Sequence, residues 1–181
     1  MPAGQGRRGS GRASIDGMPT PAETRPRRAG VRRLSSGELE VWQAFLRAHA
    51  LVTRRLEADL LAEHGLPLAT YDVLVQLVTA PERRLRMTEL ADRVMLSRSG
   101  LTRLVDRLER EGLVQRTACP SDARGFFTEL TDEGYRRLRA ASPTHLRGVR
   151  QYAVGGLSPT DRRQLRDLLA RMGEEAESSQ P

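Results

Sequence analysis

The sequence predicts a mainly α-helical fold with a small β-hairpin wing, in which a winged helix-turn-helix lobe lies between N- and C-terminal dimerisation helices. From residue 38 onward, apolar residues recur three and four positions apart, which is the period of an amphipathic helix. Two short helical segments, 89–94 and 98–111, are followed by two β-rich segments, 113–117 and 126–130, with turn residues between them. This order of elements indicates a winged helix-turn-helix.

The composition sets the size of the core and locates the excess charge. With 181 residues the chain is long enough for one domain or two small lobes, and 38% apolar but only 4% aromatic residues predict a core of Leu, Val and Ala. All 30 basic side chains are Arg, against 23 acidic ones. Residues 1–37 hold eight Arg and two acids, and so carry +6 of the total net charge of +7. The excess positive charge therefore lies in the N-terminal segment, and by itself it does not indicate that the folded core binds nucleic acid.

Several classes of protein are excluded. No apolar run approaches the roughly 20 residues that cross a bilayer, and no signal peptide follows the N-terminal arginines. The single cysteine, Cys119, excludes an intrachain disulfide and indicates a reducing compartment, so we expect a cytoplasmic, nucleoid-associated protein. His49, His64 and His145 lack metal-ligand spacing, and Gly-rich phosphate-binding motifs are missing, so we expect no metal and no cofactor. No nucleophile or acid–base pair stands out, which argues against an enzyme.

Residues 1–36 form an Arg-, Gly- and Pro-rich segment without hydrophobic periodicity, which we expect to be a disordered arm. A solvated leader, or a start codon placed ahead of Met18, is the favoured interpretation. An arm that lies along DNA phosphates is the functional alternative.

Residues 37–66 are the expected N-terminal dimerisation helix, with Ser36 as its N-cap. Gly65 and Pro67 form a stop signal, because Gly accepts a left-handed cap and Pro cannot continue a helix. A short helix is then expected to start at Thr70. The long helix carries one apolar stripe: Trp42, Phe45, Leu46, His49, Val52, Leu56 and Leu60.

Residues 67–131 make up the predicted DNA-binding lobe. Thr88 is the expected cap of helix 89–94, and Ser97 is the expected cap of helix 98–111. Residues 120–125 have turn chemistry and connect the strands of the hairpin. The second helix has an apolar inner face: Leu101, Leu104, Val105 and Leu108.

Residues 132–176 are the expected C-terminal dimerisation helices, and 177–181 form a frayed tail. Thr131 caps the first of these helices, Ser142–Pro143 predicts a break, a kink or a fresh helix N-terminus, and Ser158–Pro159 starts the last helix. The last helix carries an apolar stripe that would exceed the usual patches of monomers if left exposed. We expect this stripe to form a dimer interface, with packing within the chain as the alternative: Leu165, Leu168, Leu169 and Met172.

The first turn of helix 98–111 carries side chains that can bind DNA. Its outward positions are Arg98, Ser99, Thr102 and Arg103, with Ser97 at the cap. Arg can bind guanine O6 and N7 through two hydrogen bonds, and Ser and Thr can donate to bases or phosphates. No acid lies in this turn, which favours DNA contact over ion pairs on a solvated face. One turn later, two arginines are instead expected to pair with nearby acids: Arg107 and Arg110 with Asp106, Glu109 and Glu111.

The hairpin adds Arg116, Asp122 and Arg124 as candidates. A wing arginine can enter the narrow minor groove, where the negative potential is enhanced, so Arg124 is the expected groove contact. Asp122 is expected to orient that guanidinium, and Arg116 to contact a phosphate. An ordinary turn pair of Asp122 and Arg124 is the alternative.

These candidates lie within an ordered set of motifs that covers about residues 38–175. The strongest stretch runs from Leu96 to Glu109 and is followed by Gly112-Leu113-Val114. Ser121 to Gly125 and Leu130 to Gly134 form a wing signature, and three earlier segments belong to the same set: Gly65 to Pro67, Tyr71 to Leu74, and Leu85 to Ala91. The set resembles the MarR (multiple-antibiotic-resistance regulator) family of bacterial transcription factors.

The resemblance implies an obligate homodimer of intertwined terminal helices, in which each protomer presents one winged lobe to DNA. Such a dimer would bind a palindromic operator with half-sites about one helical turn apart. Many relatives bind small aromatic anions, such as phenolic acids, between the dimer helices and the lobe, and a ligand that prefers the wrong lobe spacing shifts the population away from DNA binding. Four residues are candidates for such a pocket, with core or dimer packing as the plainer alternative: Trp42, Phe45, His49 and Tyr71.

The expected function is that of a homodimeric, sequence-specific regulator of transcription, a repressor relieved by a small aromatic or phenolic ligand. The alternative is a non-specific architectural DNA- or RNA-binding protein that acts through the basic arm. Such a protein would lose its binding when residues 1–36 are deleted, but the arm lacks aromatic residues for base stacking. A redox role for Cys119 is disfavoured because the chain has no resolving cysteine.

Overall fold

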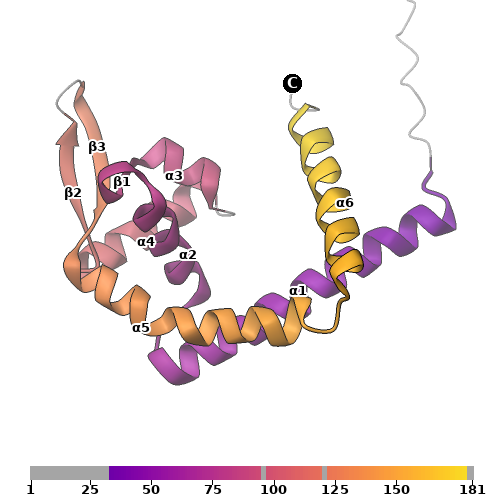
Figure 1. Cartoon of the computed structure of the whole chain (residues 1–181). Helices are drawn as coiled ribbons and strands as arrows, with labels where there is room; N and C mark the ends of the chain where they lie inside the picture. The colour runs from indigo at the N-terminus through magenta and orange to yellow at the C-terminus, as the bar shows by residue number, and fades with distance from the viewer. Residues whose placement is uncertain (1–32, 95–96, 120–121, 179–181) are drawn as a thin grey trace, which may run out of the picture.

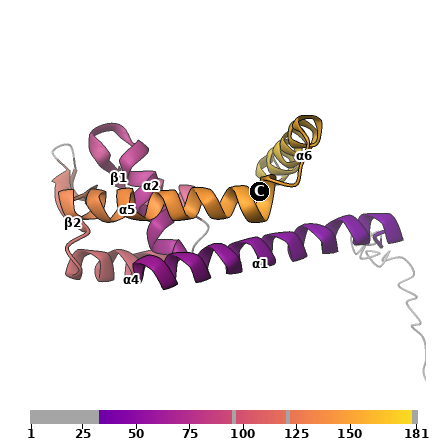
Figure 2. The ribbon, with the colours of Figure 1, turned by 60° about the horizontal axis from the view of Figure 1, so that its bottom comes forward.

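Two long helices, α1 (Ser36–His64) and α5 (Asp132–Val149), run side by side and connect a small lobe to a projecting C-terminal helix, α6 (Pro159–Ser178) (Figures 1 and 2). The structure, a computed structural model, describes residues 33–94, 97–119 and 122–178. A π-helical turn, η2 (Arg150–Val154), joins α5 to the segment before α6. The lobe contains the remaining elements: α2 (Leu68–Thr79), the 3-10 turn η1 (Pro81–Arg83), β1 (Arg84–Arg86), α3 (Met87–Arg93), α4 (Arg98–Arg110), β2 (Val114–Cys119) and β3 (Asp122–Leu130). The predicted fold class, mainly α with a winged helix-turn-helix, is confirmed.

The N-cap of α1 is Ser35, one residue earlier than expected. The Ser35 hydroxyl accepts a hydrogen bond from the Glu38 N–H, and the Glu38 carboxylate accepts one from the Ser35 N–H at 2.7 Å. Ser36 lacks this reciprocal arrangement, because the residue three positions on is Leu39 and not an acid. At the other end, Gly65 adopts a left-handed φ of 58°, which confirms the predicted stop.

The two short helices of the lobe both begin before their expected caps. α2 starts at Leu68 rather than Thr70, because Pro67 occupies the N-cap position and the Glu57 carboxylate of α1 accepts a hydrogen bond from the Leu68 N–H. α3 starts at Met87 rather than after Thr88, and the Glu89 side chain accepts from the Arg86 N–H at 2.9 Å. In both cases a carboxylate satisfies a free backbone donor at the helix start.

The wing is part of a three-stranded antiparallel sheet with the order β1-β3-β2. The predicted hairpin of β2 and β3 is present, with Arg116 opposite Thr128, but β3 begins at Asp122, four residues before the expected start. β1 was not expected, since three residues are too few to show a period of two, and it pairs with the far side of β3. The sheet therefore joins the segment before α3 to the wing.

α5 runs without a break through Ser142 and Pro143, where a break or kink was expected. The flanking residues Ala141 and Thr144 are buried, and α5 packs against α1 so closely that a β-carbon at Gly148 would lie 2.7 Å from Leu56 Cδ2. Packing on both sides of the proline thus outweighs the one backbone hydrogen bond that Pro removes. The remaining predicted signals are confirmed: Thr131 caps α5, and Ser158 accepts from the Asp161 N–H at the start of α6.

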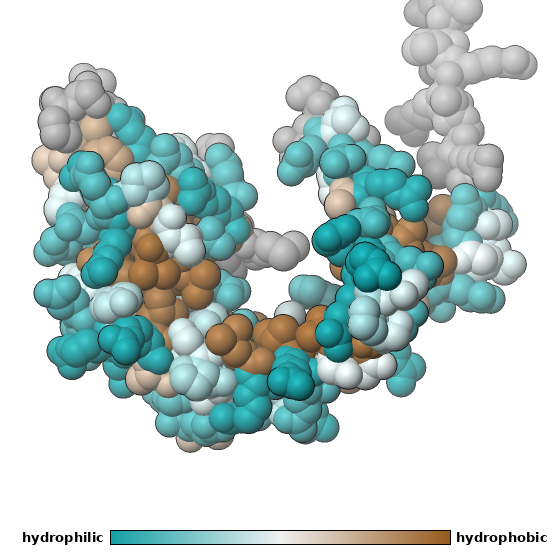
Figure 3. All heavy atoms as spheres, in the orientation of Figure 1, coloured by the Kyte–Doolittle hydropathy of each residue, from teal (hydrophilic) through white to brown (hydrophobic). Residues whose placement is uncertain are grey.

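The hydrophobic core lies in the lobe and in the adjoining halves of α1 and α5. It contains the predicted inner face of α4, together with Val73 and Leu77 of α2, which are fully buried. By contrast, α6 has no buried residue among those described, and the N-terminal half of α1 exposes Val41, Trp42 and Leu46. Figure 3 shows apolar surface on the concave side between the lobe and α6. A single chain therefore leaves the apolar faces of its two terminal helices uncovered.

Candidate nucleic-acid interface and ligand cavity

The first turn of α4 projects from the lobe in the orientation that the sequence predicts. Ser97 caps the helix, its hydroxyl accepting from the Gly100 N–H at 3.2 Å. Ser99, Thr102 and Arg103 are exposed. Their direction is fixed because the opposite face of the helix is buried: Leu101, Leu104, Val105 and Leu108. The backbone of Arg98 begins the helix, and its side chain lies outside the described part of the structure.

The arginines of α4 differ in what they contact. Arg103 has no hydrogen-bond or ion-pair partner among the described residues, so its guanidinium is available to DNA. Arg107 donates to the Thr70 hydroxyl at 3.2 Å and lies 3.7 Å from the Glu111 carboxylate. Arg110 donates to the Asp106 carbonyl, and not to a carboxylate as expected. The C-terminal half of α4 is thus tied to the protein through Arg107 and Arg110, whereas Arg103, nearer its start, is not.

Arg116 holds the two carboxylates that the sequence assigned to Arg107 and Arg110. From β2, its guanidinium forms ion pairs with Asp106 and Glu109 of α4, and its backbone N–H donates to Glu109 Oε1 at 3.1 Å. These partners raise the pKa of Arg116, the hydrogen bond to Asp106 contributing most. The phosphate contact expected for Arg116 would compete with these pairs.

The wing places its tip residues at the start of β3. The backbone of Asp122 pairs with Cys119 in the register, and Arg124 follows on the same strand. The side chains of Asp122 and Arg124 lie outside the described part of the structure, so their roles remain predictions. Cys119 is buried, and the Arg86 guanidinium donates to its Sγ at 3.0 Å.

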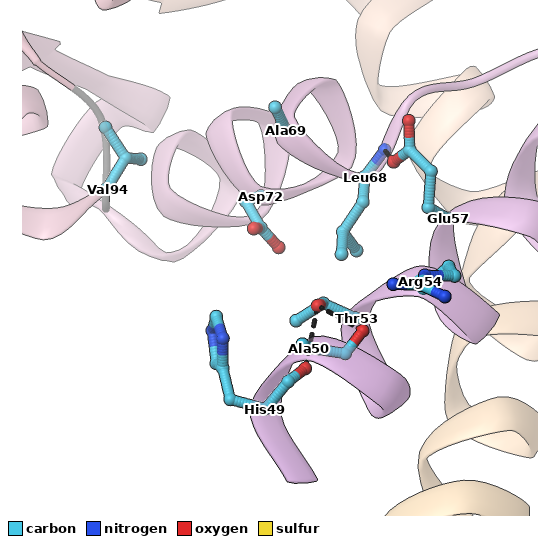
Figure 4. A pocket seen from close by; sticks show the side chains of 9 residues that line it. All are labelled: His49, Ala50, Thr53, Arg54, Glu57, Leu68, Ala69, Asp72 and Val94. Carbon is cyan, nitrogen blue, oxygen red and sulfur yellow. Dashed lines mark hydrogen bonds between the residues drawn. The ribbon is translucent and has the colours of Figure 1, made fainter. Parts of the chain in front are cut away.

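A cavity of about 600 Å³ lies between α1 and α2, at the junction of the long N-terminal helix and the lobe (Figure 4). His49 and Asp72 point into it from opposite helices. Its wall combines apolar and charged side chains: His49, Ala50, Thr53, Arg54, Glu57, Leu68, Ala69, Asp72 and Val94. Desolvation, followed by the charge of Glu57, raises the pKa of the Asp72 carboxyl. Such a site offers a guanidinium, an imidazole, a carboxyl group and an apolar wall to a small ligand.

The four predicted pocket residues do not share this cavity. Trp42, Phe45 and His49 form a row along α1, with ring centroids 6.1 and 6.5 Å apart, but only His49 of the four lines the cavity. Tyr71 faces α5 instead, where its ring stacks on His145 at 4.3 Å. The prediction missed Asp72, which is one position and 100° farther around α2 and therefore faces α1.

The predicted dimer residues of α6 lie along one exposed stripe. Leu165, Leu168, Leu169 and Met172 keep 40–50% of their surface accessible in the single chain. The alternative interpretation, in which other parts of the same chain cover these four residues, is therefore not what the structure shows. None of the helices in the described residues is long and apolar enough to span a bilayer.

Comparisons with known proteins agree with this architecture. A sequence model of the MarR family matches residues 64–125. The HTH-type transcriptional regulator YkoM of Bacillus subtilis is 33% identical over 147 residues, which cover 78% of this chain and 93% of YkoM. The chain belongs to the MarR family.

Two further MarR-type relatives bear on function. Sco3205, a MarR family transcriptional regulator of Streptomyces coelicolor solved in complex with DNA, is 43% identical with a TM-score of 0.74, over 83% of this chain and 92% of Sco3205. The HTH-type transcriptional repressor YetL of Bacillus subtilis is 32% identical over 112 residues, 62% of this chain and 66% of YetL. As a MarR family member, the chain is a DNA-binding transcriptional regulator with a winged helix-turn-helix, and not an enzyme.

Proposed function

We propose that this MarR family protein is a homodimeric repressor whose two winged lobes bind a palindromic operator, and that a small aromatic or phenolic ligand lowers its affinity for that operator. The observation that carries the proposal is the outward face at the start of α4, where no acid lies in the first turn, Ser99, Thr102 and Arg103 are exposed, and the opposite face is buried. A helix with this geometry fits the major groove, and its Arg, Ser and Thr side chains can bind base edges and phosphates. The DNA complex of the relative Sco3205 supports this use of the lobe.

The uncovered apolar faces of α1 and α6 support the homodimer. A second copy offers the same two faces, and a two-fold pairing buries them in an isologous interface. Two lobes related by a two-fold axis would then read two half-sites of opposite orientation, as a palindromic operator requires. Acting on chromosomal DNA, the protein would be cytoplasmic and nucleoid-associated.

Repression relieved by a ligand is supported by the position and chemistry of the α1–α2 cavity. An apolar ring fits against Leu68, Ala69 and Val94, and an anionic group can lie near Arg54 or His49. A phenolic hydroxyl can donate a hydrogen bond to Asp72 when that carboxyl, whose pKa is raised, is ionised. The cavity lies between a dimerisation helix and the lobe, so a bound ligand that prefers one spacing of the lobes changes the population able to bind DNA. The repressor name of the relative YetL supports the direction of regulation.

The DNA face is tested by fluorescence anisotropy with an operator duplex and a scrambled duplex over a range of salt concentrations. Arg103→Ala should weaken operator binding by about 1–3 kcal/mol and make the salt dependence less steep. Arg136→Ala, on the exposed surface of α5, is the matched control and should bind like the wild type. Unchanged operator binding by folded Arg103→Ala would contradict the proposed DNA face.

The arm-driven alternative and the ligand have separate tests. Deleting residues 1–32 should leave sequence-specific binding in place, whereas an architectural protein would lose its binding. Titration of the operator complex with 4-hydroxybenzoate as probe should release DNA from the wild type and much less from Asp72→Asn. The control Tyr71→Phe, outside the cavity, should respond like the wild type. Equal release from all three proteins would remove the α1–α2 cavity from the proposal.

A further inference from the structure

One guanidinium connects the wing to the recognition helix. Arg116 extends from the middle of β2 to the C-terminal half of α4, where it pairs with Asp106 and Glu109 at the same time. The backbone of the same residue adds a third link to α4, through Glu109 Oε1. Arg116 is half-buried in this arrangement, with 30% of its side chain exposed. A planar guanidinium can hold two carboxylates in fixed directions, which a single ammonium cannot do.

The charge of Arg116 is compensated where it lies. Asp106 and Glu109 are one turn apart on the same face of α4, so Arg116 faces two negative charges with one positive charge. The neighbouring arginines do not replace it, because Arg107 contacts Thr70 and Glu111, and Arg110 binds a backbone carbonyl. A phosphate that approached Arg116 would meet the two carboxylates as well. The geometry therefore opposes the phosphate contact that the sequence predicts for this residue.

The two elements that Arg116 joins are those that the proposed function uses to read DNA. α4 enters the major groove and the wing reaches the flanking minor groove, so both can contact one half-site only when their relative position is fixed. The backbone connects α4 to the start of β2 through the turn at Glu111 to Leu113. The wing tip lies beyond the opposite end of β2. The ion pairs of Arg116 with Asp106 and Glu109, which we call the clamp, add a second connection between α4 and the middle of β2.

We propose that Arg116 is a positioning residue, which sets the wing against the recognition helix through Asp106 and Glu109 and thereby determines specificity for the operator without contacting DNA. This inference rests on the proposed function, since it assumes that α4 and the wing read the same half-site. Because the clamp holds the wing in place before binding, the wing loses less conformational entropy when it binds DNA. This increases the affinity only for a sequence that both α4 and the wing contact.

Arg116→Lys separates the clamp from a phosphate contact, because Lys keeps the charge but cannot bridge two carboxylates. The clamp predicts an operator affinity lower by about tenfold, with the affinity for a scrambled duplex and the salt dependence unchanged. A phosphate contact predicts that Arg116→Lys binds nearly like the wild type, and that Arg116→Gln lowers the salt slope by about two per dimer. The matched control is Arg136→Lys, which changes an ion-paired arginine outside the lobe.

Removing the acids tests the clamp from the other side and does so without altering Arg116. Asp106→Asn and Glu109→Gln each leave one of the two pairs in place, so the lobe is expected to stay folded. Each removes negative charge near DNA, which alone would strengthen all DNA binding. The clamp predicts a lower ratio of operator to scrambled-duplex affinity, with weaker hydroxyl-radical protection where the wing contacts DNA and full protection where α4 contacts it. A residue with a merely structural role would lower thermal stability and leave this ratio and the footprint unchanged.

Each outcome decides between the two interpretations. Wild-type operator affinity in Arg116→Lys, or an unchanged affinity ratio in both acid variants, overturns the clamp. If Arg116→Lys does not fold, the acid variants still decide. If Arg103→Ala also binds the operator like the wild type, the assignment of α4 as the DNA-binding face is wrong. If operator affinity falls in Arg103→Ala but not in Arg116→Lys, only the clamp is overturned.

Discussion

Gly134, in the first turn of α5, packs directly against the backbone carbonyl of Leu113, so that a β-carbon at this position would lie 2.1 Å from the Leu113 oxygen. The same β-carbon would lie 2.7 Å from Leu130 Cδ1. This contact joins the turn between α4 and β2, the last residue of β3 and the start of α5. It allows the C-terminal helices to leave the lobe directly from the sheet.

Gly134→Ala should destabilise the protein by about 1–3 kcal/mol, because a backbone oxygen cannot move aside as a flexible side chain can. Chemical denaturation followed by circular dichroism measures the change in free energy of unfolding. The control is Gly37→Ala in the first turn of α1, where a β-carbon would have no neighbour within 4 Å, and which should be neutral or stabilising. Equal effects of the two substitutions would show that the Leu113 contact is not a close one.

Glu82→Gly should stabilise the lobe slightly, although Gly usually destabilises. Glu82 and Arg83 both adopt left-handed φ angles, 52° and 54°, in the turn before β1. Relief of about 1–2 kcal/mol of strain exceeds the entropy cost of Gly, about 0.5–1 kcal/mol, and the lost surface pair of Glu82 with Arg84 is weak. Thermal unfolding measures the effect. Glu133→Gly, in a helical first turn, should lower the midpoint instead, and a loss of stability in both variants would contradict the strained turn.

Stability should decrease on acidification because of His145. This side chain stacks on Tyr71, and no described residue bonds its Nδ1. Desolvation lowers the pKa of His145 below the usual value of 6.5, so the unfolded chain binds a proton more readily than the folded chain. The contribution of neutral His145 to the free energy of unfolding is thus complete above pH 6.5, and it is lost as the pH falls from 6.5 through the lowered pKa.

His145→Phe keeps the ring stack and removes the titration. Denaturation curves at several pH values between 7.5 and 5.5 should therefore show a smaller loss of stability for this variant than for the wild type. Parallel losses in the two proteins would assign the acid sensitivity to other groups.

Leu168→Glu should dissociate the proposed dimer, because it places a charge in the middle of the apolar stripe of α6. Sedimentation velocity should show a single protomer in dilute solution, and operator affinity should fall about a hundredfold or more, since the two lobes are no longer linked. Ala170→Glu introduces the same charge on the other side of α6 and is the control. A dimeric Leu168→Glu that still binds its operator would place the interface elsewhere.

Local signals in the sequence predicted the elements whose boundaries depend on their own residues. Ser97, Thr131 and Gly65 cap their helices through atoms within five positions, and each ends or begins a helix as expected. The predictions failed where distant residues decide. β1 exists because β3 lies beside it, and α5 continues through Pro143 because packing buries Ala141 and Thr144 on either side of the proline.

The candidate sites show the same division. The outward direction of Ser99, Thr102 and Arg103 follows from helical periodicity alone, and the exposed positions agree with it. The partners of Arg116 do not follow, because Asp106 and Glu109 had nearer arginines on their own helix. Periodicity also could not tell which neighbouring helix each face of α2 meets, so Tyr71 was expected in the cavity that Asp72 lines.

The most direct test of the account is hydroxyl-radical footprinting of the full-length protein on genomic DNA fragments upstream of candidate target genes at physiological salt. The account predicts two protected half-sites of opposite orientation with centres about 10–10.5 base pairs apart, or a multiple of that spacing, and loss of both when Arg103 is changed to Ala. Protection that ignores sequence, or a single isolated half-site bound by one protomer, would contradict it.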